Sequence, residues 1–444
     1  MTIVPQLNLS REALEPYWMP FTANRAFKAS PRLMIAAKGM YYTTAEGRQV
    51  LDAMAGLWCV NAGHGQQRIT DAIREQAGHL DYVSSFQMGH PIAFKAAERI
   101  AALTPAGMDH VFFVNSGSEA VDTALKIARA YHRMRGEGHR TRLIGRAKGY
   151  HGMGFGGLSV AGIGRHRRDF GPLLPDVAHL PHTYSREHQA FSRGQPDWGA
   201  HLADELEAIA QINDPSTIAA VIVEPVTGSG GVLPPPKGYL ERLRAICDKY
   251  GILLIFDEVI TGYGRLGTPF GSAALGVTPD IITCAKGMTN GAVPMGGVIA
   301  SDKVYDAFMA GPEGAVELMH GYTYSGHPLA CAAAIASIDV YEEQDIFANC
   351  ARASARWEDQ AHSLQGEPHV VDVRNIGLLA AIEIAPKAGE PGGRALAAGN
   401  ICFEAGVLVR TAGDALVLSP PLIIADGEID RIFETIRGAV RALA

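Results

Sequence analysis

Short apolar runs alternate with amphipathic helical patterns through the middle of the chain, from about residue 66 to residue 300. The clearest run, Ile252–Phe256, is apolar at every position, which is typical of a strand buried on both faces. Ile69, Ile73 and Leu80 recur instead at helical spacing. The expected strands lie at 111–114, 143–146, 218–223, 252–256, 280–285 and 298–300, and the expected helices near 66–80, from 91, at 116–131 and at 239–250. This alternation predicts an α/β fold in which a mostly parallel sheet lies between helices.

A smaller α+β unit is expected from the two ends of the chain. Strands are predicted at 33–37, 40–44, 50–51, 370–374, 378–384, 406–410 and 415–419, with helices near 346–365, 394–405 and 427–443. Residues 1–16 are expected to form a loosely held arm. We therefore divide the chain into an arm with small-domain strands (1–60), a large domain (61–327) and a C-terminal small domain (328–444). The boundary is expected inside an apolar helix at 327–345.

The composition indicates a globular protein that binds neither nucleic acid nor membranes. Hydrophobic residues make up 47% of the chain and charged residues 19%, and the net charge of −7 disfavours binding to nucleic acid or to anionic membranes. The basic cluster Arg165–Arg168 is short and is expected to form a solvated loop. Six scattered cysteines and the lack of an H-E-x-x-H motif indicate neither a disulfide framework nor a metal site. With no signal-peptide pattern and no apolar run near 18 residues, we expect a soluble, cytoplasmic protein.

An acid and a lysine follow two successive apolar runs at the point where each strand should end. Asp257 comes directly after Ile252–Phe256, and Lys286 follows residues 280–285. Open α/β sheets gather their chemistry at such strand ends. Taken singly, the aspartate could cap a turn and the lysine could be solvated. Together they suit pyridoxal phosphate chemistry, in which a lysine amine forms a Schiff base and a carboxylate keeps the pyridine nitrogen protonated.

The segment from Asn115 to Glu119 joins a predicted strand to a predicted helix. Ser116 and Glu119 have the spacing of a capping box, in which each side chain hydrogen-bonds the backbone of the other residue. The same junction, with Gly117 and Ser118 at the helix start, offers free N–H groups and a hydroxyl to a phosphate. These residues alone leave both interpretations open.

Two stretches, Gly152–Gly157 and Gly262–Gly267, match the G-x-G-x-x-G pattern of dinucleotide-binding proteins. The pattern is meaningful only between a strand and a helix. The first match is followed by residues 158–162, which have little helical character, and the second runs into Pro269 and Gly271, where a helix should begin. A nicotinamide- or flavin-linked oxidoreductase is therefore the rival class. A non-catalytic scaffold protein agrees less well with this sequence, because many of its predicted strands end in residues that are typical of an active site.

Five short motifs together resemble those of the class III aminotransferases, which bind pyridoxal 5′-phosphate. They are Asn115-Ser116-Gly117-Ser118-Glu119, Gly149-Tyr150-His151-Gly152, Val223-Glu224-Pro225, Asp257-Glu258-Val259-x-Thr261-Gly262-x-Gly264-Arg265 and Ala285-Lys286-Gly287. The resemblance extends from about residue 17 to the C-terminus. Within the class it is greatest to the omega-amino acid (beta-alanine)–pyruvate aminotransferases, through the stretches 18–25, 56–58, 320–324 and 409–414.

The resemblance implies fold type I of the pyridoxal-phosphate enzymes, with residues 61–327 as the cofactor-binding domain. It also implies a homodimer, or a tetramer of such dimers, with active sites shared between subunits. Lys286 would carry the Schiff base and Asp257 would pair with the pyridine nitrogen. Val259 and Tyr150 would pack on the two ring faces, and Glu224 would support the Asp257 side of the pocket. Gly117 and Ser118 would hold the phosphate, which Thr323 would reach from the other subunit. Trp58 would form a wall of the substrate site, and Arg410 would bind a substrate carboxylate.

The chemistry of the two central residues agrees with these roles. A buried aspartate at a strand end is costly unless it meets a cation, and a pyridinium is one. A desolvated lysine loses its proton more readily near neutrality, so Lys286 can move a proton between the substrate and the cofactor.

The expected reaction transfers an amino group from an omega-amino acid or primary amine, such as beta-alanine, to pyruvate, and gives alanine in a ping-pong cycle. The alternatives are a relative that uses 4-aminobutyrate or 2-oxoglutarate, and an aminomutase or decarboxylase on the same cofactor. Val417 stands where close relatives carry a glutamine, and Gly287-Met288 and Val60-Asn61 also differ from the commonest residues there. The preferred donor therefore stays open.

Overall fold

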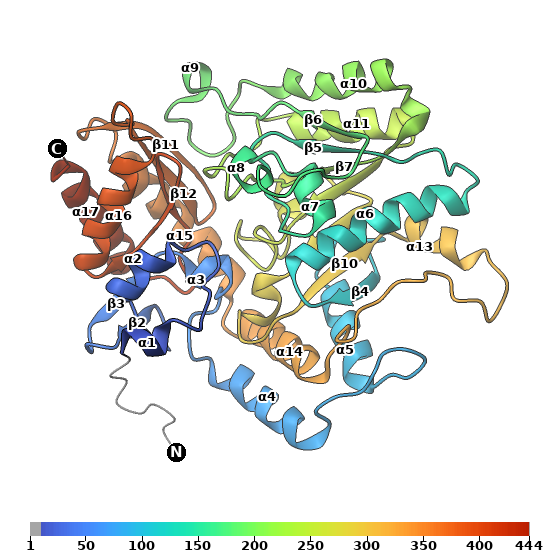
Figure 1. Cartoon of the computed structure of the whole chain (residues 1–444), viewed down its shortest axis with the longest axis horizontal. Coiled ribbons are helices and arrows are strands. Elements are labelled where there is room, and N and C mark those ends of the chain that lie inside the picture. Colours follow the sequence, from blue (N-terminus) through green and yellow to red (C-terminus); the bar gives the residue numbers. More distant parts are fainter. Residues whose placement is uncertain (1–9, 444) are drawn as a thin grey trace.

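The computed structural model describes residues 10–443, which form two parts that lie side by side (Figure 1). The larger part is built around the central sheet, and the smaller part combines strands from both ends of the chain. Of the arm expected at 1–16, residues 1–9 lie outside the described part of the chain. Beyond it come α1 (Arg11–Leu14) and α2 (Asn24–Ala29). No helix within residues 10–443 is long and apolar enough to cross a membrane.

The largest sheet in the described part of the chain has seven strands, in the order β4-β10-β9-β8-β7-β5-β6. The strands from β9 to β6 are parallel, whereas β10 is antiparallel to both of its neighbours. Their bounds are β4 (His110–Val114), β5 (Arg142–Arg146), β6 (Val177–Leu180), β7 (Ile218–Val223), β8 (Leu253–Asp257), β9 (Ile281–Cys284) and β10 (Gly296–Ala300). The mostly parallel sheet is confirmed. β6 is not among the expected strands, because four residues at a sheet edge carry little apolar pattern.

Helices cover both faces of this sheet, because successive residues of a strand point to opposite sides. Leu253 and Ile255 of β8 belong to the core under α6 (Gly117–Met134), and Leu254 and Phe256 to the core under α11 (Tyr239–Tyr250). Figure 1 shows α10 (Glu205–Asn213) beside α11, on the side of β5 and β7 away from α6. Double-sided burial explains why β8 is one continuous apolar run up to Asp257.

Residues 158–160 are helical, contrary to the expectation for the stretch 158–162. They form the end of α7 (Phe155–Val160), which packs against β5. A Cβ atom at Gly145 would lie 1.8 Å from the carbonyl oxygen of Val160. The missing side chain at Gly145 therefore permits a close approach that stabilises a short helix with little local helical propensity.

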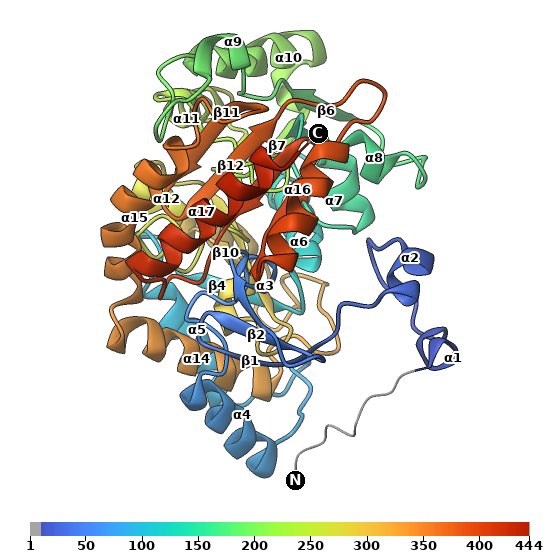
Figure 2. The same ribbon diagram turned by 90° about the vertical axis from the view of Figure 1, so that its left-hand side faces the viewer.

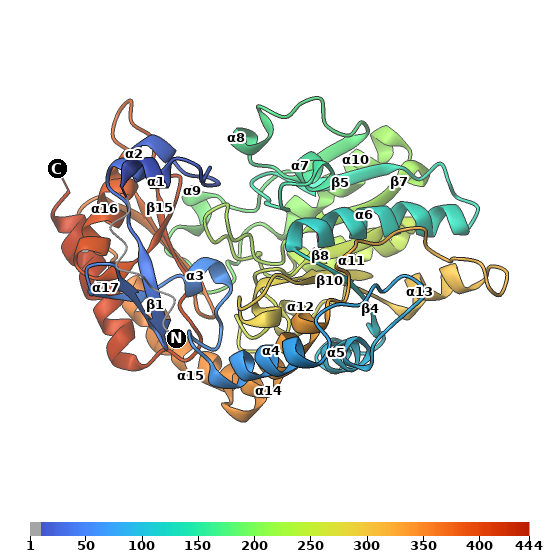
Figure 3. The same cartoon turned by 60° about the horizontal axis from the view of Figure 1, so that its bottom comes forward.

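A long helix rich in small residues, α14 (Pro328–Glu343), confirms the apolar helix expected at 327–345. It packs against α4 (Gln67–His79) and α5 (Pro91–Ala101), and Figure 3 shows it beside α4. Its alanines are mostly buried, and such small side chains let neighbouring helices approach closely.

The smaller part contains two four-stranded sheets within the described residues. The first joins β1 (Met34–Lys38), β2 (Tyr41–Thr44) and β3 (Gln49–Asp52) to β13 (Val407–Leu408), and the second has the order β11 (Val370–Ile376), β12 (Leu379–Ile384), β15 (Ala415–Leu418) and β14 (Arg410–Ala412). The strand expected at 406–410 is thus divided, because the chain leaves the first sheet and enters the second at Val409. Figure 2 shows α15 (Ile346–His362), α16 (Gly393–Glu404) and α17 (Asp426–Arg441) with β11 and β12.

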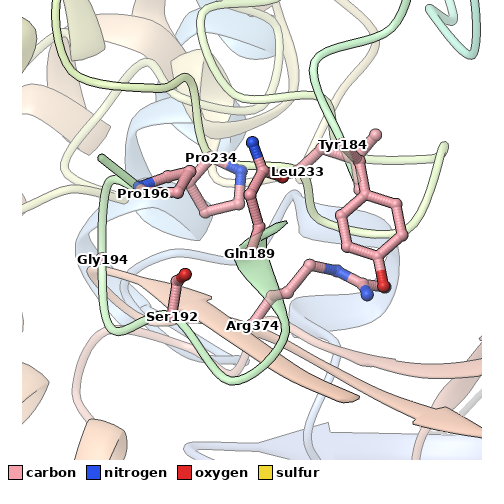
Figure 4. Close-up of a pocket in the computed structure, with 8 residues that line it drawn as sticks. All are labelled: Tyr184, Gln189, Ser192, Gly194, Pro196, Leu233, Pro234 and Arg374. Carbon is pink, nitrogen blue, oxygen red and sulfur yellow. The ribbon is translucent and has the colours of Figure 1, made fainter. Parts of the chain in front are cut away.

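Arg374 of β11 joins the two parts (Figure 4). Its guanidinium pairs with Asp372 and with Glu383, donates a hydrogen bond to the Gly231 carbonyl at 3.1 Å, and lies 4.4 Å from the ring centre of Tyr184. It borders a cavity of about 10 Å³, whose other lining residues are Tyr184, Gln189, Ser192, Gly194, Pro196, Leu233 and Pro234. A cavity of that size holds about one water molecule. We interpret this region as a packed joint between the two parts.

Candidate active site

The carboxyl ends of β8 and β9 bring Asp257 and Lys286 to the same edge of the large sheet. The two strands are parallel neighbours in which Asp257 lies opposite Thr283, so their expected adjacency is confirmed. Lys286 begins the short helix η3 (Lys286–Thr289), two residues after β9 ends. Its φ of +47° lies in the left-handed region. Such a conformation costs a non-glycine residue about 1–3 kcal/mol and is concentrated at functional sites.

Asp257 is buried and pairs with no lysine or arginine among residues 10–443. Its Oδ2 lies 2.8 Å from Nδ1 of His151, and its Oδ1 accepts hydrogen bonds from Thr283 Oγ1 and the Val259 N–H, both at 3.2 Å. A carboxylate in this position is costly unless a cationic ligand completes the site. A protonated pyridine nitrogen meets that need.

His151 is a functional residue whose role the sequence does not reveal, although it lies inside the Gly149–Gly152 motif. Its side chain is fully buried against Asp257, and its Nε2 has no hydrogen-bond partner in the described structure. The imidazole therefore orients the Asp257 carboxylate toward the cavity. Only the folded chain brings residues 151 and 257 together.

Lys286 lies next to the indole of Trp58, whose ring centre is 5.4 Å from Nζ. Burial lowers the pKa of Lys286, because a desolvated ammonium is unfavourable, while the neighbouring Cys59, Asp257 and Glu224 act in the opposite direction. Burial is the largest of these effects. The amine is therefore neutral and nucleophilic at a lower pH than the amine of an exposed lysine.

The N-terminus of α6 opens into the same cavity and fits a phosphate. Gly117 and Ser118 line the cavity and belong to the first turn, whose N–H groups have no partner within the helix. Ser118 Oγ accepts a hydrogen bond from the Met153 N–H at 3.1 Å, which leaves its own O–H free to donate. Ser116 Oγ also caps the helix by accepting from the Glu119 N–H at 3.2 Å. The geometry is thus compatible with both interpretations of this junction.

Glu224 holds the backbone of Tyr150 in place. One of its carboxylate oxygens accepts a hydrogen bond from the Tyr150 N–H and the other from the Gly228 N–H, both at 2.9 Å. Burial is the main cause that raises the pKa of Glu224. Val259 forms a neighbouring wall, where a Cβ atom at Gly117 would lie 3.0 Å from a valine methyl carbon, so a larger residue at 117 would require Val259 or α6 to shift. Tyr150 and Val259 both line the cavity beside Asp257.

Trp58 and Arg410 lie against each other in the lining of the cavity. The guanidinium carbon of Arg410 lies 4.9 Å from the indole ring centre, within the range of a cation–π contact. The Arg410 guanidinium makes no hydrogen bond or ion pair with any residue in the described part of the chain. Its cross-strand neighbour on β15 is Val417, which is buried and offers no polar group.

The loop that carries Trp58 is held in an unusual backbone conformation by a buried aspartate. Gly56 has a φ of +67° and Trp58 a φ of +59°. Asp52 accepts hydrogen bonds from the Met54 N–H at 2.9 Å and the Gly56 N–H at 2.7 Å, and lies 2.8 Å from Nε2 of His64. We infer that Asp52 and His64 position Trp58, a role that no sequence motif indicated.

One cavity of about 1390 Å³ collects nine of the ten site residues expected from the sequence. They are Trp58, Gly117, Ser118, Tyr150, Glu224, Asp257, Val259, Lys286 and Arg410. The tenth, Thr323, is exposed and lies outside this lining. Its carbonyl oxygen accepts a hydrogen bond from the Tyr82 hydroxyl at 3.0 Å.

Three residues of the basic cluster at 165–168 line the cavity, namely Arg165, His166 and Arg168. Arg165 and Arg168 are exposed, as expected for a solvated segment, but most of the cluster is helical and not a loop. Arg165 and His166 belong to α8 (Gly164–Arg167), and Arg168 follows it. The His166 ring packs edge-on against Tyr150 and against Phe21, with ring centres 5.6 and 5.5 Å apart. These contacts fix α8 over the site.

Comparison with known proteins identifies the family. Residues 23–440 match the family described as Aminotransferase class-III. The chain is 59% identical to an omega-aminotransferase of Caulobacter vibrioides, over 96% of this chain and 97% of that protein. It is 50% identical to a beta-alanine–pyruvate aminotransferase of Pseudomonas aeruginosa, over 97% and 96% of the two chains. A solved amine transaminase from an uncultivated Pseudomonas species, in its PLP-bound form, has a TM-score of 0.89 at 35% identity and covers 96% of this chain and 99% of its own. The chain belongs to the class III aminotransferases.

The enzymes of this class depend on pyridoxal 5′-phosphate, and the cavity fits that cofactor. The buried Asp257 lacks a cation, Lys286 offers an amine, and the α6 N-terminus offers donors to a phosphate. When bound, the cofactor withdraws electrons from the substrate carbon that carries the amine. The chain is therefore a transaminase of fold type I, and the oxidoreductase considered from the glycine patterns is ruled out.

Proposed function

We propose that this enzyme transfers an amino group from an omega-amino acid or primary amine, such as beta-alanine, to pyruvate, and so forms alanine. The observation that carries the proposal is Arg410, whose guanidinium lies close to the same Trp58 ring as the Lys286 amine and is bound to no acidic side chain in residues 10–443. A planar guanidinium fork is the group that best binds a carboxylate in two places. The names of the relatives from C. vibrioides and P. aeruginosa support the same substrates.

The side chains divide the work between proton transfer and orientation. Lys286, with its pKa lowered by burial, takes a proton from the substrate carbon and returns it in the reverse half. Asp257, oriented by His151, would hold the pyridine nitrogen of the cofactor and favour its protonated form. Trp58 and Tyr150 line the same cavity and would exclude water from it.

A donor panel tests this function. Beta-alanine, 4-aminobutyrate, 1-phenylethylamine and propylamine are each paired with pyruvate or with 2-oxoglutarate, and the amino acid product is quantified. We expect alanine from pyruvate with beta-alanine and with simple amines, and little glutamate from 2-oxoglutarate. Glutamate as the main product would favour the alternative acceptor. Conversion of a donor without any acceptor would favour an aminomutase or decarboxylase.

Replacing Arg410 with alanine should separate the two half-reactions. A charge-assisted contact to a carboxylate contributes about 1.5–3 kcal/mol, or about 10- to 150-fold in affinity, so the KM for pyruvate should rise by about that factor. The half-reaction with propylamine, which has no carboxylate, should change little. Single-turnover absorbance changes of each half-reaction measure this directly. An equal loss in both halves would mean that Arg410 supports the fold or the cofactor.

We also propose that the enzyme is a homodimer, or a tetramer of such dimers, in which Thr323 completes the phosphate site of the other subunit. The exposed position of Thr323, outside the cavity of its own chain, supports a role in a second subunit. We further propose that residues 61–327 act as the cofactor-binding domain, with 1–60 and 328–444 forming the smaller domain. A cytoplasmic location suits six cysteines that are all free thiols.

Mixed dimers test the sharing of Thr323. A Thr323→Ala subunit with Lys286 intact is combined with a Lys286→Ala subunit that keeps Thr323, and heterodimers are isolated by two affinity tags. If Thr323 acts in trans, the site that keeps Lys286 receives a normal threonine and recovers full cofactor affinity. The reference is the Thr323→Ala homodimer, titrated with the cofactor in the same way. Affinity no better than in that homodimer would place Thr323 in its own subunit's site or in neither.

A further inference from the structure

The outer part of the active-site cavity carries more positive charge than one pyruvate carboxylate requires. Its lining includes four arginines, Arg32, Arg165, Arg168 and Arg410. The carboxylates on the same lining are Glu224 and Asp257, which are buried and already hydrogen-bonded to Tyr150 and His151. Glu224 and Asp257 therefore do not neutralise the charge of the four arginines.

Two of these arginines have acceptors of their own. Arg168 Nε lies 3.1 Å from Asp169, and Arg32 donates to Asn400 at 2.8 Å while stacking on the ring of Phe403. The Arg165 side chain, by contrast, has no hydrogen bond or ion pair with any residue that the structure describes, and the same holds for the Arg410 side chain. Two guanidiniums without a partner thus face one cavity.

The two guanidiniums stand at different depths. Arg410 lies over Trp58, whose other neighbour is the Lys286 amine, so it is close to the reacting carbon. Arg165 is exposed on α8, next to His166, which packs on Tyr150. The charge of Arg165 also adds to the burial that lowers the pKa of Arg410, so the two groups lie close enough to repel each other. An anion between or beside them relieves that repulsion.

We propose that Arg165 is a second carboxylate-binding residue, which holds the remote carboxylate of omega-amino acid donors. The inference rests on the proposed function of the same site. In pyruvate the carboxylate is bonded to the reacting carbon, and the inner Arg410 can reach it. In an omega-amino acid two or more carbons separate the amine from the carboxylate, so a carboxylate carried outward meets Arg165 at the mouth. One cavity can then take donors and acceptors whose charges lie at different distances from Lys286.

The test compares donors that differ only in the carboxylate. Single-turnover kinetics of the donor half-reaction are measured for beta-alanine, 4-aminobutyrate and 5-aminopentanoate, and for ethylamine, propylamine and butylamine, in the wild type, Arg165→Ala and Arg165→Lys. For Arg165→Ala we expect kcat/KM to fall about 5- to 30-fold for the omega-amino acids. The amines and the pyruvate half-reaction should keep their wild-type values. Arg165→Lys should recover part of the loss, and the loss should shrink at high salt.

Arg135→Ala is the matched control, because Arg135 is an exposed arginine at the end of α6 that lies outside the cavity lining. It removes the same charge and should leave every rate unchanged. An Arg165→Ala enzyme with wild-type rates for the omega-amino acids would overturn this proposal alone. An equal loss for amines and omega-amino acids would overturn it too and assign α8 a structural role. A wild type that converts no omega-amino acid would overturn the proposed function itself.

Discussion

The Lys286→Ala variant should lose essentially all transamination while it still binds the cofactor through the phosphate. A correctly placed general acid–base alone contributes about 10²–10⁴-fold, and this variant also loses the amine that attaches the cofactor. We expect kcat to fall by more than about 10³-fold. Gly117 and Ser118 keep their donors on the phosphate, so a weakened, non-covalent complex should persist.

Borohydride reduction followed by peptide mapping measures the attachment. In the wild type the cofactor should be found on Lys286, and the protein should be yellow; in Lys286→Ala no lysine should be labelled. Lys95→Ala, an exposed lysine on α5 paired with Glu98, is the control and should behave as the wild type. Label on another lysine, or residual turnover close to that of the wild type, would remove Lys286 from its assigned role.

The Asp257→Asn variant should have the second largest effect. Asparagine has nearly the same shape but no charge, so the pyridine nitrogen loses the anion that keeps it protonated. Removal of one preorganised electrostatic group at a reacting centre typically costs about 10²–10³-fold in kcat. We expect a loss of that size together with a shifted absorption maximum of the bound cofactor, measured by steady-state kinetics and by absorption spectra.

Glu258→Gln is the matched control for that variant. Glu258 is the next residue and equally buried, but its carboxylate accepts hydrogen bonds from the Ser272 N–H at 2.9 Å and from Thr261 Oγ1 at 3.0 Å and does not line the cavity. It should lower the thermal midpoint and leave kcat within a few-fold of the wild type. If Asp257→Asn loses no more activity than Glu258→Gln, the pyridine nitrogen must be held by another group, and His151 becomes the candidate.

Two of the departures noted in the sequence, Asn61 and Gly287, meet at one place in the fold. Arg265 is fully buried and donates to Asn61 Oδ1 at 2.7 Å, while Asn61 Nδ2 donates to the Tyr263 carbonyl at 2.8 Å. A Cβ atom at Gly287 would lie 2.6 Å from Asn61 Nδ2. Burial lowers the pKa of Arg265 to about 10. Asn61 and Gly287 are thus accommodated together behind Lys286, which explains how the chemistry tolerates both departures.

The sequence by itself determined the parts of this protein that depend on local pattern. A strand buried on both faces must be apolar at every position, so β8 and β9 were visible as runs, and their ends located Asp257 and Lys286. The starts of two helices were also predictable, because serine is favoured as an N-cap, as at Ser116, and proline at the first helical position, as at Pro91. The specific spacing of the motifs then indicated the family and the cofactor.

Only the tertiary structure decided what depends on contacts between distant segments. α7 exists because Gly145 leaves room for Val160, and Asp257 is oriented by a histidine 106 positions earlier in the chain. The loop of Trp58 takes its shape from Asp52 and His64. Arg165 is exposed, as expected for the basic run, but it also lines the cavity, because the packing of His166 on Tyr150 places its helix there. Local periodicity fixes which residues are buried, whereas the neutralisation and orientation of each charge depend on which segments the fold brings within a few ångströms.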